Sequence, residues 1–288
     1  MIYYGMVLAA VVMFGLQFYA NGKFQEQCGN GVYITAVFSL FTALVGAAAL
    51  FVIGGFHFAV TPFTFLMATL AALNNLAFSY FAIRSLGLIN LSLFSVFSMV
   101  GGMVLPFVVG ILFYDEGLTA AKIICLVLIT VAMCFTVQKG ENKGGWIYYI
   151  GVFVTNGLSG VYSMIFNGAP YAKASAADYS LLGALLRIGI AGLVVLVLCK
   201  KKKSKSITVN TTVTVSLVAC GLLGVLANYL LLLSLKYIPG SLQYPLITGG
   251  VMIASTVIGY CTKSKPKPRD LAAVGIAFCG MLALLLPI

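Results

Sequence analysis

The chain has 288 residues, of which 61% are hydrophobic and 8% charged, and it carries a formal net charge of +11. Soluble domains carry about 25% charged residues, so the composition excludes an ordinary soluble protein and indicates that lipid is the main solvent. Much of the basic charge falls in two short runs, Lys200 to Lys205 and Lys263 to Arg269. Both runs punctuate apolar stretches, where charges that contact headgroups and fix topology belong, so no nucleic-acid partner is expected.

The sequence has few residues that could bind a metal or a cofactor. The seven cysteines are scattered, with no CxxC or Cys/His spacing, and the single histidine, His57, falls in an expected loop. This pattern argues against a disulfide framework, a metal site and a histidine-based triad. An intramembrane enzyme would need paired carboxylates, HExxH or a Ser/His dyad, and these are absent from the sequence. We therefore expect a protein that is not an enzyme and has no cofactor.

Apolar segments of spanning length fill the chain. A membrane-spanning helix needs about 20 apolar residues. Breaks at charged, Gly, Pro and Asn positions leave ten such segments, over residues 2–20, 31–53, 62–84, 87–113, 119–138, 146–167, 178–199, 211–235, 241–262 and 269–287. The first has no basic region before it and is long enough to span, so it is interpreted as a helix and not as a cleaved signal. The prediction is an all-α integral membrane protein with ten transmembrane helices.

The two halves of the chain resemble each other. Matching residues recur at offsets that stay between 145 and 149, in the pairs Tyr3/Tyr148, Gly15/Gly160, Asn21/Asn167, Ser85/Ser234, Ser92/Ser241 and Gly101/Gly249. Their order and spacing indicate a tandem duplication, with five-helix repeats over residues 1–143 and 144–288 that form one transport unit. With five spans per half, the second repeat must enter the membrane from the opposite side. Such inverted repeats are typical of secondary transporters, with the substrate site near the midplane between them. Because one chain supplies both repeats, we expect a functional monomer.

Basic residues in the expected loops predict the orientation. Loops after odd-numbered spans contain both basic runs together with Lys23, Arg84, Lys139 and Lys143, whereas loops after even-numbered spans contain Lys122, Lys173 and Lys236. Since cytoplasmic loops are enriched in Lys and Arg, the odd loops are expected in the cytoplasm and both termini outside. The expected location is the cell membrane, as a multi-pass protein.

Several short stretches are typical of a known family. They are the glycines Gly15, Gly157 and Gly160, the stretch Ala82-Ile83-Arg84-Ser85-Leu86, the turn Tyr114-Asp115-Glu116-Gly117, and Leu185-Leu186-Arg187. With these and the five-plus-five duplication, the whole chain resembles the EamA-like ten-helix members of the drug/metabolite transporter superfamily. The resemblance implies an exporter or exchanger for amino acids, sugars, nucleotide conjugates or drugs. The chain departs from that family in its expected external termini, and its loop 262–268 has no counterpart of Glu116.

The acidic residues suggest which transport mechanism to expect. All six lie at or near expected loops, and the first segment offers Gln17 where the related small multidrug resistance proteins carry a carboxylate. A buried carboxylate is the simplest proton carrier in a membrane, because burial raises its pKa. The pattern therefore favours a neutral or zwitterionic substrate that moves by facilitated diffusion or exchange.

Polar residues inside the apolar segments are the candidate substrate-binding groups. Amides and hydroxyls donate and accept hydrogen bonds, which suits an uncharged polar ligand or a zwitterion. The candidates are Gln17, Asn21, Asn74, Asn75, Ser98, Asn156, Ser159, Tyr162, Asn228, Tyr229, Gln243 and Tyr244, with Ser79 and Ser95 as further members of the same faces. The alternative for each is a packing role, because such groups also hold membrane helices together.

A charge and two prolines inside the expected spans also stand out. Arg187 is the one charge well inside a span. It either binds a substrate carboxylate or has a structural role, extending to headgroups or to helix-end carbonyls. Pro106 and Pro245 lie near glycine pairs in corresponding places and each removes a backbone hydrogen bond, so both are expected to act as hinges during alternating access.

The function expected from the sequence is secondary transport. The substrate would be a small polar or zwitterionic metabolite, amino-acid-like above all, with the surrounding lipids as the other partner. The alternatives are a flippase for a lipid or lipid-linked headgroup and a membrane scaffold, since inverted repeats and a polar midplane suit a flippase as well.

Overall fold

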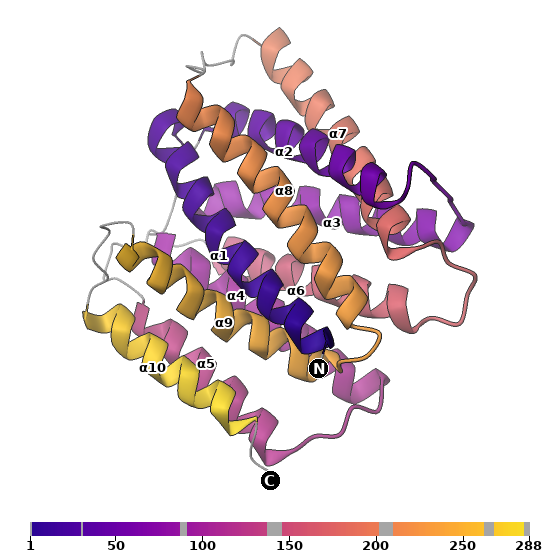
Figure 1. Cartoon of the computed structure of the whole chain (residues 1–288). Coiled ribbons are helices and arrows are strands. Elements are labelled where there is room, and N and C mark those ends of the chain that lie inside the picture. Colours follow the sequence, from indigo (N-terminus) through magenta and orange to yellow (C-terminus); the bar gives the residue numbers. More distant parts are fainter. Residues whose placement is uncertain are drawn as a thin grey trace. The chain divides into compact units, whose positions relative to one another are not determined.

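The computed structural model describes residues 2–29, 31–86, 91–136, 146–201, 210–261 and 268–284. Within these ranges the chain is all-helical (Figure 1). The helices are α1 Ile2–Cys28, α2 Val32–Ile53, α3 Pro62–Leu86, α4 Leu91–Phe113, α5 Ala120–Thr136, α6 Trp146–Gly168, α7 Ala176–Lys200, α8 Thr211–Ser234, α9 Gly240–Cys261 and α10 Pro268–Ala283. The predicted all-α class is confirmed.

Six of the helices are long and apolar enough to cross a membrane. They are α1, α2, α6, α7, α8 and α9, with 22 to 27 residues in each qualifying span. The described apolar stretches of the other four helices are shorter, at 10 to 17 residues. Large apolar side chains cover the outer surface, among them Leu112, Phe113 and Ile147, which are 67%, 76% and 70% exposed. So many exposed large apolar side chains suit contact with lipid better than contact with water.

Helix ends differ from the predicted ends by a few residues, and most at α1. The break expected after residue 20 does not occur, and α1 continues to Cys28 through Asn21 and Gly22. Adding a Cβ at Gly22 would meet nothing within 4 Å, so this glycine mediates no close contact to the described residues. One glycine costs a helix only about 1 kcal/mol, which long helices absorb.

Side-chain caps explain where several helices begin. Thr61 precedes Pro62, the first residue of α3, and its Oγ1 accepts the Thr64 N–H at 3.2 Å. Proline suits this first position because its missing N–H would be unpaired there anyway. Ser175 and Asp178 form a reciprocal capping box at the start of α7. At α8, Asn210 Oδ1 accepts the Val213 N–H at 2.8 Å.

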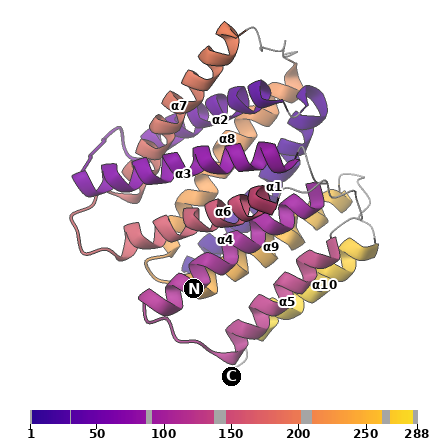
Figure 2. The ribbon, with the colours of Figure 1, turned by 180° about the vertical axis from the view of Figure 1, so that it is seen from behind.

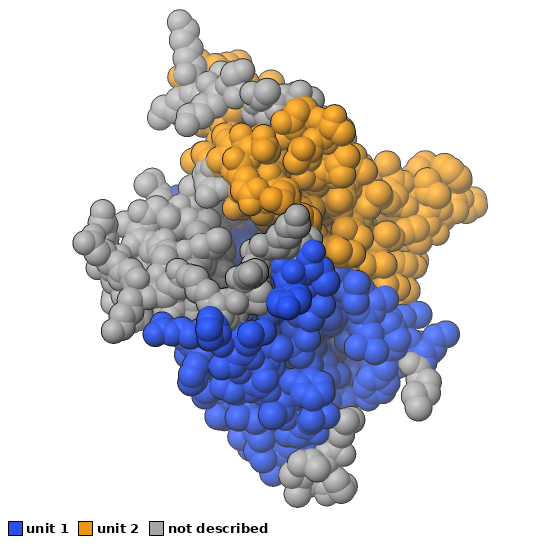
Figure 3. Space-filling view, turned by 60° about the vertical axis from the view of Figure 1, so that its left-hand side comes forward, with its two compact units in different colours: residues 1–12, 73–169, 234–288 blue, residues 13–72, 170–233 orange. Residues whose placement is uncertain are grey.

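The helices form two compact units (Figure 3). Unit 1 comprises residues 1–12, 73–169 and 234–288, and unit 2 comprises residues 13–72 and 170–233. Each unit therefore takes helices from both halves of the sequence. The predicted repeat boundary at residues 143–144 lies outside the described residues, and the repeats over 1–143 and 144–288 stay a prediction.

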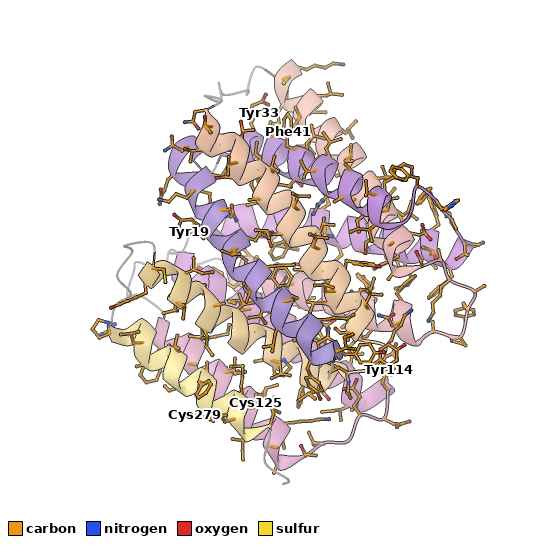
Figure 4. The ribbon with its side chains drawn as sticks, viewed as in Figure 1. Tyr19, Tyr33, Phe41, Tyr114, Cys125 and Cys279 are labelled. Atoms are coloured by element: carbon orange, nitrogen blue, oxygen red, sulfur yellow. The ribbon has the colours of Figure 1, made fainter. Side chains whose placement is uncertain are left out.

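The main core of unit 1 is built by α4, α5, α9 and α10. Helices α5 and α10 lie side by side in both ribbon views (Figures 1 and 2), and Figure 4 shows Cys125 on α5 and Cys279 on the neighbouring α10. The buried residues of this core are Met103, Cys125, Ile129, Ala132, Met133, Met252, Ala273 and Ala277. Small residues let the two backbones approach, since a Cβ on Gly280 would lie 3.3 Å from the Cys125 carbonyl oxygen.

Helices α4 and α6 of unit 1 make a close glycine-mediated contact. A Cβ at Gly157 would stand 2.6 Å from the Gly101 carbonyl oxygen, and a Cβ at Gly101 would collide with the backbone of Phe153. Only hydrogen fits at these positions, so the two glycines allow α4 and α6 to pack backbone against backbone. This contact positions the polar side chains of α6 described below.

In unit 2, α2 packs along α7, and α8 covers both. Ala47 and Leu50 of α2 form a buried cluster with Leu181 and Ala184 of α7, against which Val225 and Tyr229 of α8 pack. Gly46 and Gly221 again allow close approach, because a Cβ at Gly221 would lie 2.9 Å from the Thr42 carbonyl oxygen.

Candidate functional site

Most of the candidate side chains in unit 1 converge on α6. Asn74 of α3 is buried and its amide nitrogen donates to the Thr155 carbonyl oxygen at 2.8 Å and to Ser159 Oγ at 3.1 Å. Asn156, one residue along α6, donates to the Ser98 carbonyl oxygen of α4 at 2.6 Å. Four of the predicted site residues are thus brought together, through bonds that also tie three helices to one another.

Tyr244 and Gln243 bring α9 to the same region of unit 1. The Tyr244 hydroxyl donates to the Gly160 carbonyl oxygen of α6 at 2.9 Å, and a Cβ on Gly160 would lie 2.9 Å from the Tyr244 ring. Gln243 is fully buried, and its Oε1 accepts the Ser234 hydroxyl at 2.9 Å. Membrane-buried amides need such partners because an unpaired polar group is costly there.

Hydroxyls on α6 bond mainly along their own helix. Ser159 Oγ donates to the Thr155 carbonyl oxygen at 3.4 Å, and Ser163 Oγ to the Ser159 carbonyl oxygen at 3.2 Å. Back-bonding of this kind satisfies the hydroxyl donor while leaving its lone pairs as acceptors. Tyr162 is half-buried between them. This face of α6, with Ser159, Tyr162 and Ser163, therefore offers hydrogen-bond acceptors and aromatic surface and few free donors.

Glu116 holds the first turn of α9, a role that sequence reasoning did not assign. Its carboxylate accepts the N–H groups of Gly240 and Ser241 at 2.8 and 2.7 Å. The first N–H groups of a helix have no partner within the helix, and a carboxylate there also interacts favourably with the helix dipole. Glu116 thereby positions the turn that carries Gln243 and Tyr244. Its proximity to Pro239-Gly240, 123 to 124 positions further on, leaves no local signal.

The end of α4 places Glu116 for this contact. Gly110 accepts backbone hydrogen bonds from both Tyr114 and Glu116 at 3.2 Å, and Asp115 between them has a φ of +51°. A left-handed residue at this point turns the chain back over the helix end. The Tyr114 ring packs where a Cβ of Gly168 would stand, and burial raises the pKa of the Tyr114 phenol. Figure 4 shows Tyr114 at this end of α4.

Unit 2 contains the remaining candidates, and Gln17 is the one most enclosed. Its amide nitrogen lies 2.7 Å from the position that a Cβ of Gly224 would occupy, so the missing side chain on α8 makes room for it. Its carbonyl oxygen Oε1 is buried and has no hydrogen-bond partner among the described residues. An unsatisfied buried acceptor costs about 1–3 kcal/mol, which a bound donor would recover.

Other predicted residues of unit 2 are less enclosed. Asn21 accepts from Gln25 within α1 at 3.3 Å, and Asn228 is exposed and donates to the Gly224 carbonyl oxygen of its own helix at 2.7 Å. Tyr229 packs on the α2–α7 cluster. In unit 1, Asn75 is likewise exposed. The bonds of Asn21 and Asn228 thus stay within their own helices.

Arg187 lies in the middle of α7. It is half-buried, its Nε is fully buried without a partner, and it makes no hydrogen bond or ion pair within the described ranges. An unpaired charge inside a helical bundle is costly, so this residue requires an explanation.

Pro106 and Pro245 lie inside α4 and α9, as predicted, and both are fully buried. Their action as hinges stays a prediction. The side chains of Ser79 and Ser95 lie outside the described residues, and so do most residues of the two basic runs. The expected topology stays a prediction.

Comparisons with known proteins bear on the fold. No protein-family model matches the chain, and no curated protein matches it. Among solved structures 29 chains match. One, a crystal structure of a protein, aligns over 96% of this chain and 94% of its own with a TM-score of 0.71 and 15% sequence identity. At that identity the likeness shows the fold alone, over nearly the whole length.

Proposed function

We propose that the protein is a secondary transporter that moves a small polar or zwitterionic metabolite, amino-acid-like in character, across the cell membrane by alternating access. The finer architecture belongs to the same proposal: all ten helices span, as two inverted five-helix repeats of the EamA-like kind. An odd number of spans per half, together with the repeated residues, supports the inverted arrangement.

One observation carries the proposal, the presence in unit 2 of an unpartnered buried acceptor and an unpartnered buried donor. Gln17 Oε1 and Arg187 Nε are both buried and lack partners within the described part of the chain. A scaffold would be expected to satisfy such groups within the protein, because leaving them unsatisfied destabilises it. A transporter keeps them for a ligand, and a zwitterion would supply both a donor and an anionic acceptor.

The polar side chains of unit 1 complement this interpretation. Asn74 and Asn156 use their amide nitrogens to join helices, so their first role is packing. Back-bonded hydroxyls of α6 keep lone pairs as acceptors, and α6 packs against α4 and bonds to Tyr244 of α9, the two helices that contain the prolines. Packing and substrate contact are compatible on such helices, since transporters bind substrate with the groups that line their packed helices.

One observation favours the alternative function, a lipid flippase. The outer surface is strongly apolar over many helices, as any path for a lipid chain would require. A soluble metabolite is favoured because the unpartnered groups lie on buried atoms and not on that surface.

A thermal-stability screen of the purified protein in detergent tests the proposal. A ligand that binds only the folded state stabilises it by about 2.7 kcal/mol at a hundredfold excess over Kd. Amino acids, sugars, nucleosides, quaternary amines and soluble lipid headgroups would be compared. We expect a selective increase of the unfolding temperature with amino acids. An increase with headgroups alone would support the flippase, and no increase with any compound would count against transport of a small metabolite.

A further inference from the structure

The position of Arg187 along α7 decides between a structural role and substrate binding. The helix runs from Ala176 to Lys200, and Arg187 is its twelfth residue of twenty-five. At a rise of 1.5 Å per residue it stands roughly 16 Å from one helix end and roughly 20 Å from the other. An arginine side chain cannot cover either distance. Extension to headgroups or to the carbonyl oxygens of a helix end, the two structural roles considered from sequence, therefore does not account for it.

Arg187 also lies on the inward face of α7. Ala184 and Ala191, one turn before and after it, are 6% and 7% exposed. At 100° per residue both share its face of the helix. Leu193 and Leu196 are 64% and 63% exposed and lie on the opposite face, which is the side suited to lipid. The charge is thus directed into the protein and away from lipid tails.

The guanidinium end remains available on that face. Nε is the Arg187 nitrogen that is both fully buried and unpartnered. The two terminal nitrogens make no hydrogen bond to the described residues. They form the fork that binds planar anions with two parallel hydrogen bonds.

The surface of α7 is open at Gly183, one turn before Arg187. Helix side chains lean toward the N-terminus, so we expect the Arg187 fork over the turn that contains Gly183. A Cβ at Gly183 would meet nothing within 4 Å. Ser180, a further turn back on the same face, is half-buried and adds a hydroxyl. This face of α7 therefore combines the Arg187 guanidinium with two small residues, Gly183 and Ser180.

We infer that Arg187 binds the carboxylate of the transported molecule in the space over Gly183. This inference rests on the proposed transport function and sharpens it, because it requires an anionic group on the substrate and excludes neutral sugars and nucleosides. The shared chemistry is a pair of anionic oxygens, which a lipid phosphate also offers. The inward direction of the side chain favours the soluble carboxylate.

The test compares proteinogenic L-amino acids with their carboxamides, which lack the negative charge, as ligands of the purified protein. Binding would be measured by thermal shift and by titration calorimetry. We expect at least one amino acid to bind and its carboxamide to bind about tenfold to a hundredfold more weakly. Arg187→Gln should weaken binding of the amino acid by a similar factor and leave binding of the carboxamide almost unchanged. Arg187→Lys should weaken binding of the amino acid less.

Gly183→Leu is the matched steric variant, because it fills the proposed space without removing the charge. Its control is Gly189→Leu, where a Cβ also meets nothing within 4 Å but which lies on the opposite face. We expect binding to be lost in Gly183→Leu and retained in Gly189→Leu. These two variants also keep the test decisive should Arg187→Gln fail to fold.

Equal binding of an amino acid and its carboxamide, or unchanged affinity in Arg187→Gln and Gly183→Leu, would overturn the inference. The lipid source is tested in nanodiscs with and without phosphatidylglycerol, by native mass spectrometry. Retention of that lipid by the wild type and its loss in Arg187→Gln, without any effect of amino acids, would also overturn it. Equal flux in proteoliposomes with the wild type and with Arg187→Gln would overturn this inference alone. Absence of flux for every compound with the wild type would overturn the proposed function.

Discussion

At the scale of single residues, glycine contacts and amide bonds fix how the helices of unit 1 pack. Gly101 and Gly157 allow α4 and α6 to meet backbone to backbone, and Asn156 then reaches the Ser98 carbonyl oxygen at 2.6 Å. Close approach and an interhelical bond stabilise each other here, because the short bond requires the short helix separation.

Replacing Gly101 with alanine should strongly destabilise the protein. The added Cβ collides with the Phe153 backbone, which cannot move like a flexible side chain, and overpacking of this kind costs about 1–3 kcal/mol. The matched control is Gly275→Ala in α10, where a Cβ meets nothing within 4 Å. Unfolding temperature in detergent measures both. Equal stability of the two variants would contradict the close α4–α6 contact.

The sequence identifies these residues but not their partners. Gly101, Gly157, Asn74 and Asn156 were recognisable because small and amide residues are informative inside apolar segments. Which carbonyl oxygen an amide reaches depends on helix crossings that no local pattern encodes. The exposed Asn75 and Asn228 show the reverse case, since residue type alone made them equal candidates.

At the scale of elements, the start of α9 depends on a distant carboxylate. Glu116→Ala should release the Gly240 and Ser241 N–H groups and destabilise the first turn of α9 by about 1–2 kcal/mol. Glu116→Gln should lose less, because it keeps one acceptor oxygen. Hydrogen exchange of the α9 amides measures the effect. Asp115→Asn, at the exposed neighbour, is the control, and unchanged exchange in Glu116→Ala would refute the capping role.

The two buried prolines carry a prediction about motion. Pro106→Ala and Pro245→Ala restore a backbone donor in α4 and α9 and should stiffen both helices. We expect the maximal transport rate to fall several-fold while KM changes little, because the substrate contacts stay. Flux in proteoliposomes separates the two parameters. Wild-type rates in both variants would leave the prolines as static kinks.

Element positions follow well from sequence, because apolar length and caps are local signals. Thr61-Pro62 and Ser175 with Asp178 are local signals at the starts of α3 and α7, and the predicted starts at residues 62 and 178 lie within two residues of the observed ones. The end of α1 was wrong by 8 residues, since Asn21 and Gly22 are weak breaks inside a long helix. Glu116 as a cap for α9 was beyond reach, because the two segments meet only in the folded chain.

At the scale of the whole molecule, each compact unit combines helices from both halves of the sequence. The matched residue pairs predict a duplication with a boundary at residues 143–144, which stays a prediction. Which helices pack into one compact unit depends on tertiary contacts, so the composition of the units could not be predicted from those pairs.

The topology gives a prediction at this scale. Lys and Arg lie mainly in the loops after odd-numbered spans, so both termini should face outward. Epitope tags on the two termini should be cleaved by protease added to intact cells, and a tag placed in the basic run 200–205 should be protected. Protection of both termini with cleavage at the run would contradict the predicted orientation.

Counterflow in proteoliposomes measures whether the protein transports an amino acid. Vesicles containing the purified protein and loaded with an unlabelled amino acid would receive the same amino acid with a radioactive label outside. We expect labelled uptake that needs the internal amino acid and the protein, with no pH gradient required. Uptake no greater than in protein-free vesicles for every amino acid, alongside protein-dependent flipping of a fluorescent lipid, would contradict the account and favour the flippase.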